Sequence, residues 1–411
     1  MPTHCPIFQE VFQRIRTTAT PRQLPYAACC RLALLVTGIL AAKSSVLAHI
    51  AAELDALHMT QASTAESIAR RLRRTLNDPH LTPAGCYTPV LKQVVDWPQL
   101  LAGSRRVVLV IDESTKADEI HLLRVSLPYW GGSLALAWAV WQQNVPLPEG
   151  EYWRQVDTVL TTVAALVPPN LEVIVVADEF FAIPAFIERL QAYGWHWAIR
   201  ITPNGSHHFR DQQGRESRLG ERVRHQVRQP GQRWKARGAV FKEAGWYAVS
   251  LIAVWTPGAE EPLVVLSDLP PDWGVLRHYD RRFWTEPGFR NDKRKGWQWE
   301  ASQVQGVDHH AVLLLGMAWA SLVTLCLGVE EARARLAAAA ARPGDGKRRG
   351  RPRHARESGF TLGLHHLRAW LYCTWRRPLR WRLPEVDSVS WSDRWHQAQA
   401  QRLILSPPVR P

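Results

Sequence analysis

Two aspartates stand directly after short runs of apolar, mostly β-branched residues. Asp112 follows Val-Leu-Val-Ile, and Asp178 follows Val-Ile-Val-Val-Ala. Such runs predict buried strands, and ligands of α/β proteins gather outside the carboxyl ends of strands of this kind. An unpaired carboxylate at that position is costly unless it meets solvent, a donor or a cation. Carboxylate oxygens suit Mg²⁺ or Mn²⁺, so we expect Asp112 and Asp178 to hold metal.

Other acids lie close to both positions. An aspartate alone is also a common loop opener and helix cap. Glu179 follows the second aspartate, and the neighbours of the first are Glu113, Asp118 and Glu119. We favour Asp112 and Asp178 because each is the first polar residue after its predicted strand.

A third acid, Glu286, belongs to a spaced set of polar residues. The set is Tyr-x2-Arg-x3-Glu-x6-Lys, formed by Tyr279, Arg282, Glu286 and Lys293. At about 100° per residue, its members fall within roughly 60° of one another on a helix. Such a face sets a carboxylate for a metal between two cations that can bind phosphates. The alternative is an ordinary ion pair on a solvated helix face. Pro287 and Gly288 follow Glu286 directly, so we expect the common face to be kinked between Glu286 and Lys293.

The elements that would carry these residues form a mixed α/β sheet. Their patterns predict three strands, a helix, a strand, a helix and a strand, in that order. The predicted strands are residues 107–111, 122–127, 134–141, 171–177 and 195–201, and the helices are 152–166 and 183–193.

Further segments flank and interrupt this sheet. A helical stretch at 31–57 precedes it, short strands at 234–241, 246–255 and 262–266 interrupt it, and an amphipathic helix lies around 362–375. The predicted segments are an N-terminal helical DNA-binding domain (1–100), a first catalytic part (101–202), a β-rich insertion (203–271), a second catalytic part (272–342), and a basic linker with a C-terminal helix (343–411).

The charge of the chain favours a polyanionic partner. Lys and Arg number 51 against 37 Asp and Glu, which gives a net charge of +14. A field of that sign attracts nucleic acid most commonly, although a merely soluble basic protein or an anionic membrane surface would also fit. Apolar residues make up 46% of the chain, which is typical of a folded protein and excludes a disordered one.

Basic residues gather at two places. The helix predicted around residues 67–76 surrounds its apolar positions with Arg70, Arg71, Arg73 and Arg74, and such a helix can lie along a phosphate backbone or form a solvated face. The linker contains Arg349-Gly350-Arg351-Pro352, which looks like the core of an AT-hook that reads a narrow minor groove. An ordinary flexible linker is the alternative there.

The cysteines and the apolar segments argue against several other classes of protein. The six cysteines form no CxxC pair, so neither structural zinc nor a disulfide framework is expected. We see no signal peptide in residues 1–13. Residues 311–328 are almost wholly apolar, and we interpret them as a buried helix rather than a membrane span. We expect a cytoplasmic protein with no membrane partner.

The spaced set resembles the signature of a known family. In type and spacing, Tyr279, Arg282, Glu286 and Lys293 match the bacterial DDE transposases of the insertion-sequence group named for its Tyr-Arg-Glu-Lys motif. The match extends to Phe289 and to the two strand-end aspartates, in order. The segment from Val-Ala-Asp178 to residue 200 is similar to that family's second acidic block. The resemblance covers roughly residues 30–380, and it departs at Glu179, where a basic residue is more usual.

This resemblance implies an RNase H-like catalytic core with a β-rich insertion between the second and third acids. It implies that Asp112, Asp178 and Glu286 are catalytic and bind two Mg²⁺ or Mn²⁺ ions on either side of a scissile phosphate. It implies DNA contacts by Tyr279, Arg282, Arg290 and Lys293. Many family members form a hairpin with a flipped base stacked on an aromatic of the insertion. Trp234, Trp246 and Trp255 are candidates for that role, each with a core position as the alternative.

The expected activity is that of an endonuclease and strand transferase. It would bind the terminal inverted repeats of an element, cleave there, and join the 3′ ends to target DNA by cut-and-paste transposition. Pairing two ends implies a homodimer in the synaptic complex, associated with the bacterial nucleoid. The alternative is a catalytically inactive relative that only binds DNA.

Overall fold

The computed structural model describes residues 5–18, 24–60, 64–203, 207–340, 357–371 and 379–383. They form two compact units. The first contains the described residues of Met1–Gly103, Glu113–Pro168 and Glu286–Val386, and the second contains those of Ser104–Asp112 and Pro169–Thr285.

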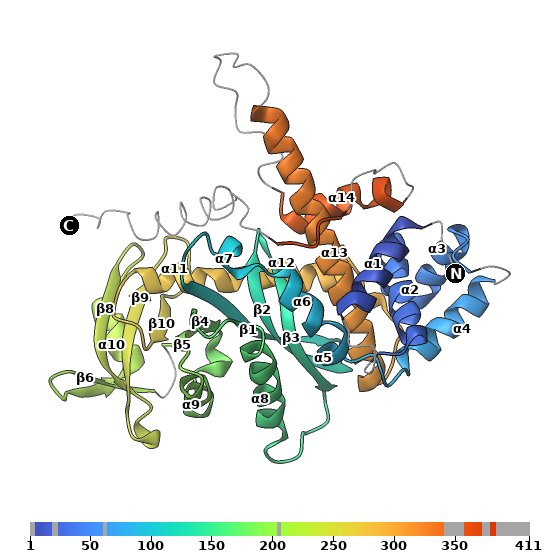
Figure 1. Ribbon diagram of the computed structural model, residues 1–411. Helices are drawn as coiled ribbons and strands as arrows, with labels where there is room; N and C mark the ends of the chain where they lie inside the picture. Colours follow the sequence, from blue (N-terminus) through green and yellow to red (C-terminus); the bar gives the residue numbers. More distant parts are fainter. Residues whose placement is uncertain are drawn as a thin grey trace. The chain divides into compact units, whose positions relative to one another are not determined.

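The second unit is built on a mixed sheet (Figure 1). Its strands lie in the order β1-β4-β5-β10-β9-β8-β6-β7. β1 pairs with β4, and β4 with β5, in parallel, whereas the pairs from β5 to β7 are antiparallel. The bounds are β1 (Arg106–Lys116), β4 (Glu172–Ala177), β5 (His196–Arg200), β6 (His208–Asp211), β7 (Glu216–Arg218), β8 (Arg233–Val240), β9 (Tyr247–Val254) and β10 (Leu263–Ser267).

The core of this unit lies between one face of the sheet and helix α11 (Gly274–Tyr279). Val110, Val176 and Ala198 come from the parallel strands, and α11 contributes Tyr279 among others. Residues on one face of a strand alternate along it, so this cluster identifies the face that α11 covers. Helices α9 (Pro184–Ala192) and α10 (Leu219–Gln226) complete the unit, with short 3₁₀ turns at Glu179–Phe181 and Lys242–Ala244.

The β-rich segment extends the sheet instead of forming one of its own. β10 pairs antiparallel with β5 over Val265↔Arg200 to Ser267↔Ala198, and β9 and β8 follow. The short strands expected between residues 234 and 266 are therefore present, and they join the sheet of the parallel strands through the β10–β5 pair. The expected mixed α/β class is confirmed.

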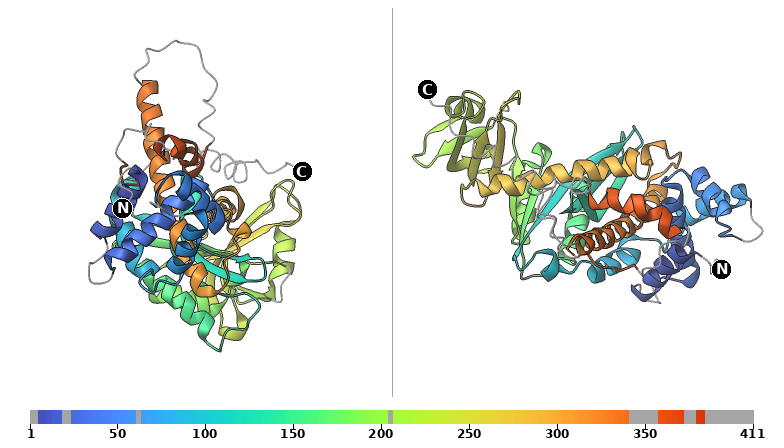
Figure 2. Two further views of the ribbon diagram at one scale, coloured as in Figure 1. Left: turned by 90° about the vertical axis from the view of Figure 1, so that its right-hand side faces the viewer. Right: turned by 90° about the horizontal axis from the view of Figure 1, so that it is seen from above.

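The first unit combines a hairpin with helices. β2 (Ile120–Tyr129) and β3 (Gly132–Gln142) pair antiparallel, and α8 (Glu151–Ala164) packs against them. Figure 2 shows α13 (Val307–Ala340) beside α14 (Gly359–Leu371). The other helices are α1 (Pro6–Thr18), α2 (Tyr26–Ala42), α3 (Leu47–Ala56), α4 (Ala65–Leu76), α5 (Pro83–Cys86), α6 (Thr88–Val94) and α7 (Trp97–Leu100).

The long apolar run lies in α13. That helix is long and apolar enough to cross a membrane by length and composition, and 94% of its most apolar window is buried inside the protein. α2 and α3 would pass the same test only as one span bent by 91°. The helical stretch expected at residues 31–57 is divided between these two helices, and Lys43 takes a left-handed conformation (φ 48°) at the break.

The segment that carries the spaced polar set is not one regular helix. α11 ends at Tyr279 and is followed by a 3₁₀ turn at Asp280–Trp284, by α12 (Thr285–Arg290) and by a π-helical turn at Asn291–Lys295. Helical regularity is lost between Glu286 and Lys293, as expected, but at the π-helical turn. Pro287 itself lies in the first turn of α12, where a missing N–H is tolerated. A further 3₁₀ turn follows at Trp299–Ala301.

Candidate active site

Asp112 and Asp178 occupy equivalent positions on adjacent parallel strands. The β1–β4 ladder ends at Val110↔Val176, and each aspartate lies two residues beyond its member of that pair. A spacing of two returns a side chain to the same face, so both carboxylates belong to the face that α11 covers. β1 itself runs on to Lys116, and the strand does not end at Asp112 as expected.

A single arginine joins the two carboxylates. Arg282 Nη2 donates a hydrogen bond of 2.6 Å to Asp178 Oδ2 and lies 3.8 Å from Asp112 Oδ1. The side chain of Arg282 is only 12% exposed. A partly desolvated guanidinium binds carboxylates more strongly than one in water, so Arg282 neutralises part of the negative charge at this edge.

Thr285 adds a second contact to Asp112. Its Oγ1 lies 3.0 Å from Asp112 Oδ2 and 2.8 Å from the carbonyl oxygen of Arg282, so its one hydroxyl proton has two acceptors within reach. Thr285 is buried and directly precedes Glu286. Sequence reasoning missed this residue, and its only local signal was that position beside the expected third acid.

Arg200 and Tyr279 complete the surroundings. Arg200, at the end of β5, places Nη1 3.9 Å from Asp178 Oδ1 and Nη2 3.2 Å from Glu261 Oε1. Tyr279 is 1% exposed and belongs to the core, and burial raises the pKa of its phenol above the usual range. The structure thus places Tyr279 beneath the site, and its expected DNA contact stays a prediction.

The aspartate pair suits a divalent cation. Both side chains offer hard oxygen ligands, and the space between them already accommodates a cationic group, that of Arg282. Asp178 Oδ1 is buried and accepts no hydrogen bond from any described residue. Within the described ranges, no group of three His, Cys, Asp or Glu side chains converges. Asp112 and Asp178 are the candidate ligands that share Arg282 as a partner.

The competing acids are engaged elsewhere. Glu179 accepts a hydrogen bond from the hydroxyl of Thr202. In the first unit, Glu113 accepts from Tyr152 at 2.8 Å and lies 2.7 Å from His121 Nε2. Glu119 pairs with Lys116 at 2.8 Å. These contacts favour Asp112 and Asp178 over their neighbours.

Glu286, Arg290 and Lys293 belong to the first unit. Glu286 and Arg290 are exposed and lie four residues apart on α12, hence on one face of it. Lys293 lies in the π-helical turn, and burial lowers the pKa of its ammonium group.

A buried ion pair attaches this segment to the β2–β3 hairpin. Arg124 on β2 donates to Asp292 Oδ2 at 2.5 Å, and its guanidinium lies 4.0 Å from the ring centre of Phe289. Arg124 is 6% exposed, and burial raises the pKa of Asp292. A Cβ on Gly288 would overlap Ser133 Oγ on β3, so the helix approaches the hairpin as closely as a glycine allows.

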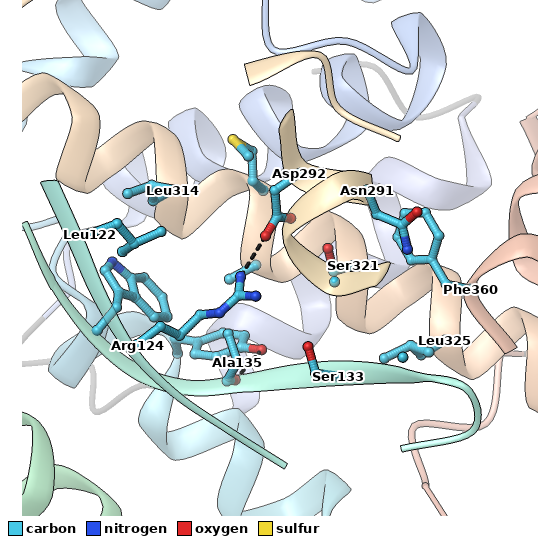
Figure 3. A pocket seen from close by; sticks show the side chains of 16 residues that line it. Leu122, Arg124, Ser133, Ala135, Asn291, Asp292, Leu314, Ser321, Leu325 and Phe360 are labelled. Carbon is cyan, nitrogen blue, oxygen red and sulfur yellow. Dashed lines mark hydrogen bonds and ion pairs between the residues drawn. The ribbon is translucent and has the colours of Figure 1, made fainter. Parts of the chain in front are cut away.

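A small pocket lies beside this pair (Figure 3). Its accessible volume of about 30 Å³ is enough for one or two water molecules. Nε and Nη2 of Arg124 and the hydroxyl of Ser133 are buried without a hydrogen-bond partner in the described part of the chain. Water in the pocket would satisfy them, so we assign it a structural role.

The other expected DNA-binding residues are scattered. Arg70, Arg71, Arg73 and Arg74 are exposed on α4, whose opposite face is buried. Arg349 and Arg351 lie outside the described residues. The three insertion tryptophans, Trp234, Trp246 and Trp255, are half-buried, so none of them occupies the fully buried core.

Comparisons with known proteins point to one family. Residues 154–323 match the family model described as "Transposase DDE domain"; this segment contains Asp178 and Glu286 and begins after Asp112. No curated protein matches the chain. A solved structure of Argonaute from Aquifex aeolicus aligns with 12% identity and a TM-score of 0.23 over 43% of this chain. The alignment spans 24% of that protein's length, and a TM-score this low does not establish a shared fold.

Proposed function

We propose that this chain cleaves DNA at the terminal inverted repeats of a mobile element and joins the freed 3′ ends to target DNA, because residues 154–323 match the model of a transposase DDE domain. A transposase domain implies a DNA substrate. Cut-and-paste transposition also requires two ends to be held together, for which we propose a homodimer in the synaptic complex. We place its action in the bacterial cytoplasm, at the nucleoid.

One observation carries the proposal. Asp112 and Asp178 lie on adjacent parallel strands, on the same face, and share Arg282 as a partner. Two carboxylates at the ends of neighbouring parallel strands are a natural site for cations and phosphate. We interpret the parallel strands β1, β4 and β5 with their helices as an RNase H-like core, into whose sheet the insertion strands continue.

We assign roles to the site residues as follows. Asp112, Asp178 and Glu286 would hold two Mg²⁺ or Mn²⁺ ions. When bound, such ions lower the pKa of an attacking water or 3′-hydroxyl and neutralise charge on the phosphate. Arg282, Arg290 and Lys293 would bind phosphates, because guanidinium and ammonium groups match their charge and donor needs.

The protein's own groups prepare the site. Arg282 and Thr285 orient the carboxylates of Asp178 and Asp112 through the contacts described above. Burial of Tyr279 beneath them fixes the end of α11 and hence the start of the turn that carries Arg282. In the protein without metal, each carboxylate is therefore held in a restrained rotamer, and a metal ion that binds there would take the place of Arg282 between them.

The test is a cleavage and strand-transfer assay with purified protein and DNA that carries the inverted repeats flanking the gene. We expect Asp112→Asn, Asp178→Asn and Glu286→Gln each to abolish nicking in Mg²⁺ and Mn²⁺. The neighbouring variants Glu113→Gln and Glu179→Gln are matched controls, since each removes one carboxylate one residue away. Strand transfer by Asp112→Asn or Glu286→Gln at the wild-type rate would overturn the assignment.

No observation favours the catalytically inactive alternative. Both strand-end aspartates and Glu286 are present, and Pro287 is accommodated in the first turn of α12. Wild-type protein that binds the element ends in Mg²⁺ and Mn²⁺ but never cuts them would support that alternative.

A further inference from the structure

A row of paired residues that is basic at both ends and apolar between them crosses the sheet of the second unit and ends beside Asp178. Lys235 on β8 pairs with Ile252, which pairs with Val265, which pairs with Arg200. Residues paired across a sheet share a face, so Lys235 lies on the same face as Arg200, which is 3.9 Å from Asp178. At about 4.8 Å per strand, four steps separate Lys235 from Asp178 by about 19 Å.

Arg233 and Lys235 are held over one aromatic ring. Their charged groups lie 5.0 Å and 5.6 Å from the ring centre of Trp273. Trp273 packs against the core and directly precedes α11. A cation over an indole face is held by the ring's negative potential, while both side chains stay exposed. The two cations are thus fixed in place with their donors still open to solvent.

Helix α11 connects this group to the site. Arg277 is exposed on it, four residues after Trp273. Nine residues separate Trp273 from Arg282, which at 1.5 to 2.0 Å per residue is about 14–18 Å. This agrees with the estimate across the sheet, so Arg233, Lys235 and Arg277 lead along α11 towards Asp112 and Asp178.

None of these three residues forms an ion pair with any described residue. Asp272 accepts the backbone N–H of Gly274 at 2.7 Å, and its carboxylate lies on the same side of Gly274 as the guanidinium of Arg277, so it offsets part of that charge. Cations that are restrained and exposed, and that lead to a pair of carboxylates, fit a polyanion whose phosphates reach that pair.

We propose that Arg233, Lys235 and Arg277 bind the sugar-phosphate backbone of duplex DNA beside the cleavage site. The inference rests on the proposed function for the identity of the polyanion. At 3.4 Å per base pair, the distance of about 14–18 Å places the contacts of Arg233 and Lys235 about four to five base pairs from the scissile phosphate. Arg277 is closer to Arg282 along the chain, so its contact lies about two to three base pairs away. Contacts to phosphate position DNA without reading its sequence, so the track formed by these three residues holds any duplex.

Salt dependence of binding tests the track. Fluorescence anisotropy with a labelled duplex of arbitrary sequence, without divalent metal, gives the slope of log K against log salt. The triple variant Arg233→Gln, Lys235→Gln, Arg277→Gln is expected to reduce the magnitude of that slope by about 2.7, or about 0.9 for each phosphate that is no longer neutralised. Arg277→Gln alone is expected to reduce it by about 0.9, which guards against a triple variant that folds poorly.

The matched control removes the same charge from elsewhere in the unit. Arg218, Arg224 and Arg228 are exposed, on β7, on α10 and just after it. Changing all three to Gln is expected to leave the slope at its wild-type value. A wild-type slope for the track variants, or an equal reduction in the control, would overturn the proposal.

These outcomes separate the track from the proposed function. A reduced slope in the track variants supports the track even if no DNA is ever cleaved. Wild-type protein that does not bind duplex DNA would overturn both.

Discussion

Arg282 donates a hydrogen bond of 2.6 Å to Asp178, and the same Nη2 atom lies 3.8 Å from Asp112. The guanidinium therefore occupies the space between the two carboxylates that we propose as metal ligands. A divalent ion entering that space has to displace it, and a DNA phosphate offers the displaced arginine a new partner.

Replacing Arg282 is therefore expected to strengthen metal binding by the DNA-free protein. A hydrogen bond to a charged group contributes about 1.5–3 kcal/mol, so Arg282→Gln should bind Mn²⁺ about tenfold to a hundredfold more tightly. Calorimetry or the electron paramagnetic resonance signal of free Mn²⁺ measures this without DNA. Arg281→Gln, which removes the same charge one residue away, is the control and should leave the affinity unchanged. Equal affinities in Arg282→Gln and wild type would show that the guanidinium does not compete.

Thr285 is expected to act as a positioning residue for Asp112. Thr285→Val removes the hydroxyl contact to Asp112 Oδ2 with little change in volume. Such a hydrogen bond is worth about 1.5–3 kcal/mol, so the rate of DNA cleavage should fall about tenfold or more. Thr285→Ser keeps the hydroxyl and should restore the rate. If the serine variant were as slow as the valine variant, packing and not the hydroxyl would be responsible.

The buried ion pair of Arg124 and Asp292 is expected to make a large contribution to the free energy of unfolding of the first unit. Arg124→Met leaves Asp292 buried without its cation, and breaking a buried pair in this way costs about 3–5 kcal/mol. The double variant Arg124→Met, Asp292→Leu removes both charges and should recover much of that stability. Urea denaturation of the single and double variants gives the coupling between the two side chains. A double variant that is as unstable as the two single variants combined would contradict a direct interaction.

His310 should make the protein sensitive to acid. Its Nδ1 accepts a hydrogen bond of 3.2 Å from Trp299 Nε1, which requires the neutral ring, and burial lowers the pKa of His310 to about 4. In the unfolded chain the imidazole has a pKa near 6.5. The stability that the neutral His310 ring contributes is therefore fully present above pH 6.5 and is lost as the pH falls towards 4. The destabilisation amounts to about 3 kcal/mol.

The comparison that checks this is the free energy of unfolding at pH 7 and pH 4.5 for wild type and His310→Gln. The variant should lose less stability than the wild type on acidification. His278, whose pKa burial also lowers to about 4, provides the parallel variant His278→Gln. Identical pH dependence in the wild type and His310→Gln would show that folding does not lower the pKa of His310.

The strands and their aspartates could be predicted because their signals are local. A β-branched run followed by Asp is visible in six residues, and Asp112 and Asp178 do occupy equivalent places on neighbouring strands. The prediction that Tyr279 and Lys293 share one helix face is less reliable, because it assumes a regular α-helix. Between these residues the backbone passes through a 3₁₀ turn, the short helix α12 and a π-helical turn.

The interactions that hold the site and its flanking segment have no local signal. Arg124 and Asp292 are 168 residues apart, and Arg282 and Asp178 are 104 apart. Gly288 is an example. In the sequence, a glycine after Pro287 indicates the break of a helix, whereas in the structure its lack of a side chain lets Ser133 pack against the helix. Only the packed structure shows which long-range neighbour a side chain meets.

The pairing of β10 with β5 has a consequence for biosynthesis and for evolution. Arg200 and Val265 are paired although 265 − 200 = 65 positions separate them, so β5 acquires its second neighbour only after the whole intervening segment has left the ribosome. Long-range pairing of this kind slows folding. A chain that lacked this segment would also expose an unprotected strand edge next to the strand that carries Asp178, and such an edge promotes aggregation. Deleting the segment would therefore remove a neighbour of β5 and not only a separate module.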